Sequence, residues 1–188
     1  ITAGHHGNEP AGPLAALEFL RRYADGQFTT DFSITIFPLV NPDGYMLNTR
    51  ENSHGVDLNR QYDDPAEPEI LSLISSLDSR DYIAAIDMHE APRYDRGFFI
   101  YESTPTGEDI ELGKIMVQSV GEYYEIAPRG NNGVVRYDRP NCCRDFWHRR
   151  GSYAVTPETP GAFELDDRKN MHIISLESAI SYLEDIYL

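Results

Sequence analysis

The chain has 188 residues, of which 40% are hydrophobic, and its formal net charge at pH 7 is −15. This size and apolar content suit one domain with a single buried core. The negative charge argues against nucleic acid or an anionic lipid surface as the main partner, because both would be repelled. No apolar run approaches the length of a membrane span, so we expect neither nucleic acid nor membrane among its partners.

Cys142 and Cys143 are the only cysteines, and they are adjacent. Adjacent cysteines rarely bridge each other and no second pair exists, which excludes a disulfide framework. No signal peptide is visible. The compartment stays undetermined, with the cytoplasm slightly favoured. The chain opens on Ile1-Thr2-Ala3-Gly4, which resembles the tail of a strand, and we expect that one or more N-terminal strands precede it.

The predicted elements alternate between strands and helices, without repeats, low-complexity tracts or linkers. Pro10 suits a first helical turn, and the spacing of apolar residues carries that helix to about Tyr23. β-branched and aromatic residues predict a strand over 33–40, ended by a turn at 41–44. The remaining predicted elements are a helix over 69–77, strands over 83–86 and 98–101, a helix over 110–124, a strand over 152–156 and a helix over 173–187.

This alternation predicts a single α/β domain over residues 1–188, with a mixed, mostly parallel, twisted sheet flanked by helices. Polar residues directly follow three of the predicted strands: His6 after 1–3, His89 after 83–86 and Glu158 after 153–156. In open α/β sheets the crevice beyond the carboxyl ends of the strands is where ligands bind. We therefore expect these three side chains to meet at one edge of the sheet.

Two histidines and a glutamate match the ligand set of a catalytic zinc site. Glu9 lies three residues after His6, and the intervening Gly7 and the following Pro10 indicate a loop that can turn both side chains onto one ion. His89 follows an apolar run much further along the chain. Two imidazoles and a carboxylate leave the fourth position of a tetrahedral zinc ion open. We predict one Zn²⁺ bound by His6, Glu9 and His89.

Other residues near these ligands allow different assignments. His5 competes with His6 as a ligand, and the three-residue spacing to Glu9 favours His6. Asp87 or Glu90, which flank His89, could orient a ligand imidazole by hydrogen bonding. Three further histidines have no partner at ligand spacing, and we expect them at the surface: His54, His148 and His172.

The sequence also contains NPDGY at 41–45, Arg50, GVDLNR at 55–60 and YAVTPE at 153–158. Together with His6, Glu9 and His89, these blocks resemble the zinc carboxypeptidases related to carboxypeptidase A. They occur in the order found in that family and run from residue 3 to about residue 160. The resemblance implies the zinc carboxypeptidase fold in a compact version, because the stretch between Glu9 and His89 is contracted.

The resemblance also implies roles for individual residues. Glu158 would be the general base that takes a proton from the attacking water and returns it to the leaving amine. Arg50 would polarise the scissile carbonyl and hold the developing oxyanion, which suits a permanently charged, forked guanidinium. Asn59 and Arg60 would bind the free C-terminal carboxylate of the substrate, and Tyr137 matches a mobile tyrosine upstream of the glutamate.

The segment 141–147 precedes Glu158 at the place where this family selects the terminal side chain. We predict that Arg144 faces the pocket and favours an acidic terminal residue; the alternative is a surface arginine paired with Asp145. After Glu158 the chain continues with Thr159-Pro160-Gly161, where many members have an apolar residue and an arginine. The pocket beside Glu158 is therefore expected to differ, and a smaller rim would admit unusual or branched peptides.

The predicted function is that of a zinc-dependent metallocarboxypeptidase, which hydrolyses a C-terminal amide bond of a peptide with a free carboxylate. The alternative enzyme is a zinc-dependent N-acyl amino acid deacylase that resembles succinylglutamate desuccinylase and aspartoacylase. NPDGY favours the peptidase, whereas Gly7-Asn8-Glu9 and the small size leave the deacylase open. A murein-peptide amidase and an inactive binding module are further alternatives.

Overall fold

The structure is a computed structural model, and it describes residues 1–77, 81–93, 96–103 and 111–188. Its elements in chain order are β1 Thr2–Ala3, α1 Ala11–Ala24, α2 Pro42–Leu47, the 3₁₀ helix η1 Leu58–Arg60, α3 Pro68–Ser75, β2 Ala84–Ala91, β3 Phe99–Ser103, α4 Leu112–Gly121, β4 Val134–Arg136, α5 Cys143–His148, β5 Tyr153–Pro160 and α6 Leu165–Tyr187. Within the described ranges, none of the helices combines the length and the apolarity needed to cross a bilayer.

Five strands form one sheet in the order β1-β2-β5-β3-β4. The pairs β1–β2, β2–β5 and β3–β4 are parallel, and only β3–β5 is antiparallel. The predicted mixed, mostly parallel α/β fold is confirmed. The central strands β2 and β5 are buried along almost their whole length, as expected for strands that helices cover on both faces.

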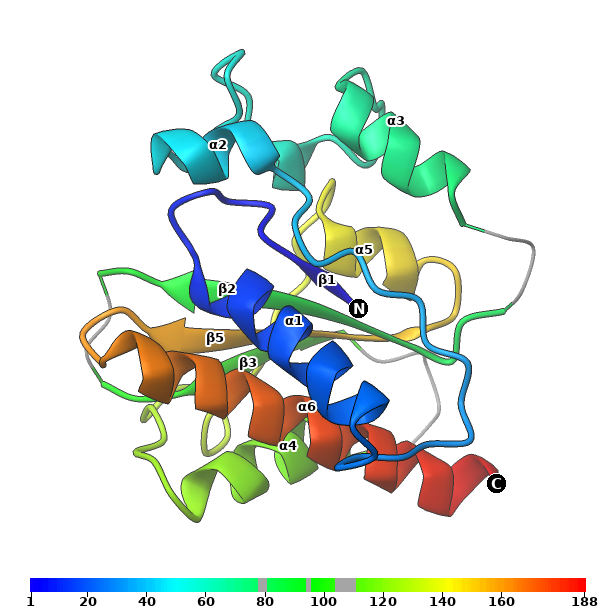
Figure 1. Cartoon of the computed structure of the whole chain (residues 1–188), viewed down its shortest axis with the longest axis vertical. Helices are drawn as coiled ribbons and strands as arrows, with labels where there is room; N and C mark the ends of the chain where they lie inside the picture. Colours follow the sequence, from blue (N-terminus) through cyan, green and yellow to red (C-terminus); the bar gives the residue numbers. More distant parts are fainter. Residues whose placement is uncertain (78–80, 94–95, 104–110) are drawn as a thin grey trace.

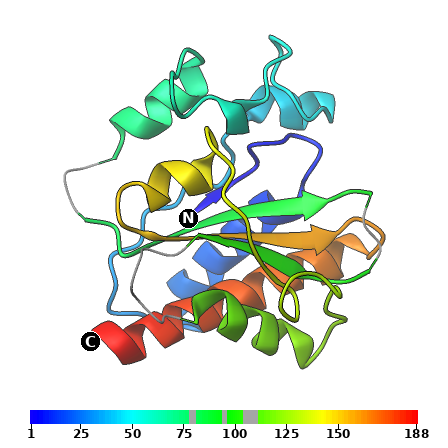
Figure 2. The same ribbon diagram turned by 180° about the vertical axis from the view of Figure 1, so that it is seen from behind.

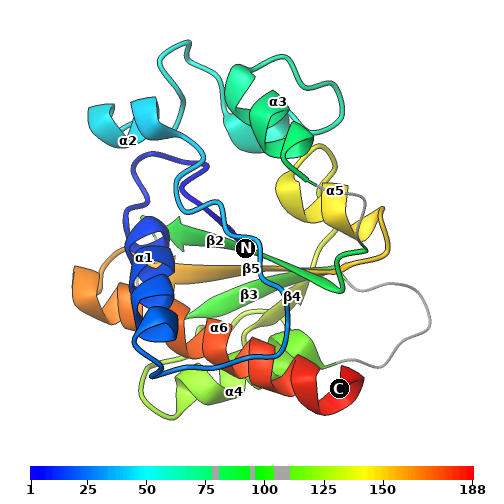
Figure 3. The same cartoon turned by 45° about the vertical axis from the view of Figure 1, so that its right-hand side comes forward.

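Helices cover the two faces of the sheet unequally (Figure 1). α1, α4 and α6 pack on one face, where a core cluster includes Phe19, Met116 and Leu176. α5 lies on the other face, and α3 lies beyond it, as the view from behind shows (Figure 2); Trp147 and Leu73 belong to the core cluster there. Figure 3 shows that α2 and α3 stand above the β1 end of the sheet, away from α4 and α6.

Segment 33–40, predicted as a strand, forms only an isolated parallel bridge between Thr2 and Phe37. It still lies along β1, because Ala3 donates to the Phe37 carbonyl (3.0 Å) and Phe37 donates to that of Ile1 (2.9 Å). Pro38 has no N–H with which to extend the ladder. The predicted turn at 41–44 is wrong: it is the start of α2.

The start of α2 has a clear local cause. Asn41 accepts the backbone N–H of Gly44 through its side chain at 2.8 Å, and Pro42 occupies the first turn. An asparagine cap followed by proline is a typical helix start. The same residue types are common in turns, which explains the wrong prediction.

The predicted strands 83–86 and 152–156 are too short, because β2 runs to Ala91 and β5 to Pro160. His89 and Glu158 therefore lie within strands rather than after them. The C-terminal helix begins at Leu165, eight residues before its predicted start, and its first turn carries Asp166 and Asp167, which suit a helix N-terminus. Residue 110, where the third helix was predicted to start, lies outside the described residues, and the matching helix α4 is described from Leu112.

The three remaining histidines differ in burial. His54 is exposed, with 65% of its side chain accessible, as predicted. His148 is half-buried. His172 is fully buried on α6, with Nε2 3.5 Å from the Thr159 hydroxyl, so the predicted surface position is wrong. Burial lowers the pKa of His172 to about 3, which keeps the ring neutral.

Candidate metal centre

The three predicted ligands converge on one point. His6 Nδ1 lies 2.7 Å from Glu9 Oε1, His89 Nδ1 lies 2.8 Å from Glu9 Oε2, and the two Nδ1 atoms are 3.1 Å apart. All three side chains are buried. Donors around a tetrahedral zinc ion with bonds of about 2.1 Å are about 3.4 Å apart. The donor set therefore fits one zinc ion after a small outward movement.

The loop between β1 and α1 places His6 and Glu9. Gly7 is needed in this loop because a Cβ there would lie 1.8 Å from the carbonyl carbon of Gly44. Glu9 Oε2 also accepts the backbone N–H of Glu90 at 3.0 Å, which ties the loop to β2. The loop geometry thus depends on close packing against α2 and on one hydrogen bond from the strand that carries His89.

The far nitrogen of His6 has a carboxylate partner. Its Nε2 lies 3.2 Å from Asp57 Oδ1, and Asp57 Oδ2 accepts two hydrogen bonds from Arg50, at 2.8 and 3.2 Å. Burial opposes ionisation of Asp57, but hydrogen bonding and positive charge at His6 and Arg50 hold its pKa below the usual range. Such a partner fixes the orientation of a ligand imidazole and leaves Nδ1 free to bind the cation.

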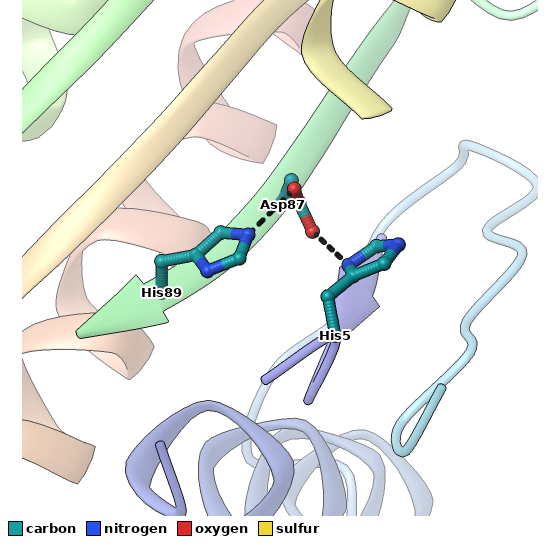
Figure 4. Close-up of side chains that lie close together, drawn as sticks. All are labelled: His5, Asp87 and His89. Atoms are coloured by element: carbon teal, nitrogen blue, oxygen red, sulfur yellow. Dashed lines mark hydrogen bonds and ion pairs between the residues drawn. The ribbon is translucent and has the colours of Figure 1, made fainter. Parts of the chain in front are cut away.

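A second cluster shares His89 with the first and has the same type of donor atoms: His5, Asp87 and His89. Asp87 lies between the two rings, 2.9 Å from His5 Nδ1 and 2.8 Å from His89 Nε2 (Figure 4). Here the far nitrogen of His5 is already 2.6 Å from the Tyr62 hydroxyl. His5 and Asp87 lie behind the ligands and do not line the cavity described next, so they suit orientation of His89 better than catalysis.

One cavity of about 200 Å³ opens beside the first cluster. All nine residues predicted for the site line it: His6, Glu9, Arg50, Asn59, Arg60, His89, Tyr137, Arg144 and Glu158. They come from five separate stretches of the chain. The side chain of Arg50 is 40% exposed, which leaves it accessible to a molecule in the cavity.

Glu158 stands beside His89, because the two residues are paired in the parallel register of β2 and β5. Burial raises the pKa of the Glu158 carboxyl to about 8; Glu9 and Asp87 also raise it, against the effect of His89. A carboxyl group with a pKa near neutrality can both accept and release a proton under ordinary conditions. The arrangement thus places a proton-exchanging group next to the candidate ligands.

The residues predicted to bind a terminal carboxylate differ in their exposure and in the hydrogen bonds that they already make. Asn59 is buried, with Oδ1 accepting the backbone N–H of Cys143 at 2.8 Å and Nδ2 2.9 Å from His89 Nε2. Arg60 is half-buried, and its guanidinium donates to the carbonyl of Asn59. Tyr137 is 53% exposed at the rim. Arg60 and Tyr137 are thus more accessible to a ligand than Asn59, whose amide already has partners at both ends.

Arg144 is 5% exposed and lines the cavity. Its guanidinium donates to three uncharged oxygens: Ser103 Oγ at 3.1 Å, Thr156 Oγ1 at 3.4 Å and the Tyr137 carbonyl at 2.5 Å. Asp145 instead pairs with Arg149 at 3.0 Å, so the alternative of a surface Arg144–Asp145 pair is wrong. No ion pair found among the described residues involves Arg144, which leaves its charge without a carboxylate there.

Two contacts in this site were missed from the sequence. Asp57 belongs to the GVDLNR block, two residues before Asn59, but the sequence analysis assigned no function to its carboxylate. Thr156 lies on the same face of β5 as Glu158, because side chains two apart share a face of a strand. The alternation of side chains along a strand would have placed Thr156 on the same face as Glu158 if the predicted strand had extended beyond residue 156.

Parts of the sequence are similar to known proteins. The profile of the zinc carboxypeptidase family matches residues 1–82. Carboxypeptidase D of Anas platyrhynchos is 31% identical over 109 residues; the match includes 45% of this chain and 8% of the length of that protein. This chain therefore corresponds to a small part of that curated relative.

Solved structures extend the similarity over nearly the whole chain. A candidate metallopeptidase of Shewanella denitrificans OS217 superposes with a TM-score of 0.84 at 24% identity, over 97% of this chain and 73% of that one. Murein-tripeptide amidase of Escherichia coli O157 superposes with a TM-score of 0.66 at 20% identity, over 95% of this chain and 79% of that one. At these identities the structures show a shared fold.

Proposed function

We propose that the chain is a zinc-dependent peptidase of the zinc carboxypeptidase family, whose profile matches residues 1–82, and that it hydrolyses a C-terminal amide bond. The observation that carries the proposal is the cavity beside His6, Glu9 and His89, which collects every predicted catalytic and substrate-binding residue. A bound zinc ion supplies a Lewis acid and lowers the pKa of water to about 7. The chain itself supplies a base, an oxyanion donor and cationic groups for a carboxylate.

Each of these groups has a position that suits its role. Glu158, beside His89, takes a proton from the attacking water and returns it to the leaving amine. Arg50, held by Asp57 and 3.3 Å from His6 Nδ1, donates to the oxygen on which negative charge develops. Arg60 and Tyr137 bind the terminal carboxylate. Asn59 supports them, because its Oδ1 accepts the backbone N–H of Cys143 and its Nδ2 donates to Asp87 Oδ2 at 3.4 Å.

The proposed substrate has an acidic terminal residue. Arg144 is the reason: it is buried in the cavity wall, and its hydrogen-bond partners are all neutral. A buried guanidinium gains from a carboxylate partner that it does not have within the described chain. A substrate carboxylate that reaches Ser103 and Thr156 would provide that partner.

A prediction follows for Arg144. Replacing it with glutamine is expected to lower kcat/KM for a peptide ending in glutamate by about 10- to 100-fold, since a hydrogen bond to a charged group contributes about 1.5–3 kcal/mol. Turnover of a peptide ending in leucine should change much less. The matched control is Arg149→Gln, which removes a neighbouring guanidinium that is half exposed and pairs with Asp145. Equal losses for both peptides, or a wild-type preference for lysine, would contradict the acidic specificity.

The proposed function itself is tested with the wild-type protein loaded with zinc. Peptides ending in glutamate, leucine and lysine are compared with N-succinylglutamate, N-acetylaspartate and a murein tripeptide. Release of a terminal amino acid, lost after chelation and restored by zinc, is the expected result. Turnover of the acyl amino acids alone would favour the deacylase, turnover of the murein tripeptide alone would favour the amidase, and no zinc binding at all would favour an inactive module.

A further inference from the structure

A buried row of polar groups runs from the metal centre into the protein, away from the cavity. It begins at His89 and continues through Asp87 to His5 and Tyr62 (Figure 4 shows the first three). The four side chains are at most 4% exposed. None of them except His89 lines the catalytic cavity, so the other three cannot act on a substrate directly.

Asp87 is the central member of this row, and each of its oxygens has its own partners. Oδ1 accepts the Thr2 hydroxyl at 2.7 Å and faces His5 Nδ1 at 2.9 Å. Oδ2 faces His89 Nε2 at 2.8 Å. A carboxylate held on one side by Thr2 and His5 has its other oxygen directed at His89.

The far end of the row is closed by a phenol. The Tyr62 hydroxyl lies 2.6 Å from His5 Nε2, and the Tyr62 ring packs against Phe146 at 5.2 Å between centroids. Burial raises the pKa of Tyr62 well above its usual value, so the phenol remains a donor. When it donates to His5 Nε2, a neutral His5 carries its proton on Nδ1, which is the nitrogen that faces Asp87.

The hydrogen bond from His89 to Asp87 determines the position of the proton on His89 in the same way. With Asp87 as acceptor, the proton of a neutral His89 is on Nε2, and Nδ1 presents its lone pair to the point where His6 and Glu9 meet. His5 and His89 are also stacked, with centroids 5.8 Å apart and planes 14° apart. Packing and hydrogen bonding therefore constrain the position of Asp87 and the plane of the His89 ring together.

We propose that His5 is a positioning residue for the metal centre: through Asp87 it sets the tautomer and the orientation of His89. The proposal rests on the proposed function, in which His89 holds a cation. It gives His5 a role other than that of a competing ligand. Groups that orient a ligand imidazole typically change metal affinity by about 10- to 100-fold when they are removed.

The test compares the zinc affinities of three variants, each prepared without metal and then titrated with zinc. His5→Phe keeps a ring for stacking but loses both nitrogens, and zinc affinity, measured by competition with a chromophoric chelator, should fall about 10- to 100-fold. His5→Asn retains an amide N–H close to the position of Nδ1 and should recover most of the affinity. Tyr62→Phe should cause a smaller loss. The control His54→Gln removes an exposed imidazole and should leave the affinity unchanged.

A second measurement separates positioning from general destabilisation. In the zinc-loaded proteins, the ¹H and ¹⁵N shifts of the His89 Nε2–H group should indicate a strong hydrogen bond to Asp87 in the wild type and a weaker one in His5→Phe. Unchanged zinc affinity and unchanged shifts in folded His5→Phe would overturn the proposal. If His5→Phe does not fold, Tyr62→Phe decides: wild-type zinc affinity and unchanged His89 shifts, with a loss limited to thermal stability, would overturn the proposal.

These outcomes are distinct from failure of the proposed function. A wild type that binds zinc but cleaves no amide would refute the proposed function, and the affinity differences among the variants would still test the role of His5. A wild type that binds no zinc would refute both.

Discussion

Replacing Glu158 with glutamine is expected to lower kcat by about 100- to 10,000-fold, the range typical for a general acid–base group. Glutamine retains the size of the side chain but cannot accept the proton of the attacking water. Zinc affinity should remain close to that of the wild type, because Glu158 is not one of the three converging donors. The measurement is kcat with a glutamate-terminated peptide at saturating zinc, alongside chelator competition. A loss of less than tenfold would contradict the role of Glu158 as the base.

The same variant should be more stable than the wild type when metal is absent. Burial raises the pKa of Glu158 from 4.5 for the free group to about 8 in the folded protein. Its favourable contribution is therefore complete below pH 4.5 and is lost as the pH rises towards 8. Glutamine does not ionise, so Glu158→Gln should gain stability across this window.

We expect a gain of about 2 kcal/mol at pH 7.5, from 1.36 kcal/mol per pKa unit discounted for partial exposure. Urea unfolding of chelator-treated protein at pH 4.5 and pH 7.5 measures it, with a difference between the two proteins only at the higher pH. Glu122→Gln on the surface is the control. A gain of equal size at both pH values would mean that ionisation of Glu158 is not the cause.

The pairing of His6 with Glu9 could be predicted from sequence because its information is local, whereas His89, which meets Glu9 across 80 positions, was identified from its place after a predicted strand and from the family resemblance. His6 and Glu9 are three residues apart, and Gly7 and Pro10 exclude a regular helix between them. The partners of these ligands are different, because their contacts join distant residues: Asp57 meets His6 across 51 positions, and Tyr62 meets His5 across 57. Residue types alone do not specify such pairs, since several carboxylates and tyrosines could have served equally.

The extent of the strands was missed for a related reason. Asp87 and Glu90 resemble the start of a polar loop, yet both are buried inside β2. They can be buried because each has partners from other segments, which sequence patterns do not reveal. The alternation of helices and strands was sufficient for the fold class. Short elements such as α5, with six residues, do not have enough periodicity to be recognised.

Replacing Arg168 with methionine is expected to destabilise the protein by about 3–5 kcal/mol, the usual effect of removing one partner of a buried ion pair. Arg168 contacts Glu90 Oε2 and donates to the Phe163 carbonyl at 3.0 Å. The Glu90 side chain is 1% exposed, so its charge would be buried without a cation. Methionine preserves much of the apolar stem. Urea unfolding of the zinc-free protein measures the loss.

A matched control is available on α1. Arg21 also makes two short ion pairs, at 2.7 Å from Glu18 and Asp25, but its side chain is 53% exposed. Arg21→Met should therefore reduce the stability much less than Arg168→Met does. If both arginine variants lose the same stability, burial of the Arg168–Glu90 pair is not the cause of the loss in Arg168→Met.

Neutralising Glu90 provides the complementary test. The double variant Glu90→Gln/Arg168→Met should recover much of the stability, because it leaves no buried charge unpaired. Recovery will be partial. The amide oxygen of glutamine can still accept the backbone N–H of Ala11, as Glu90 Oε1 does at 2.6 Å at the start of α1, but its NH2 group replaces the oxygen that faced Arg168 and has no acceptor there. Because the backbone N–H of Glu90 donates to Glu9 Oε2, Arg168→Met should also weaken zinc binding. The ion pair between β2 and α6 thus supports the ligand loop from behind, although Arg168 itself lies outside the cavity.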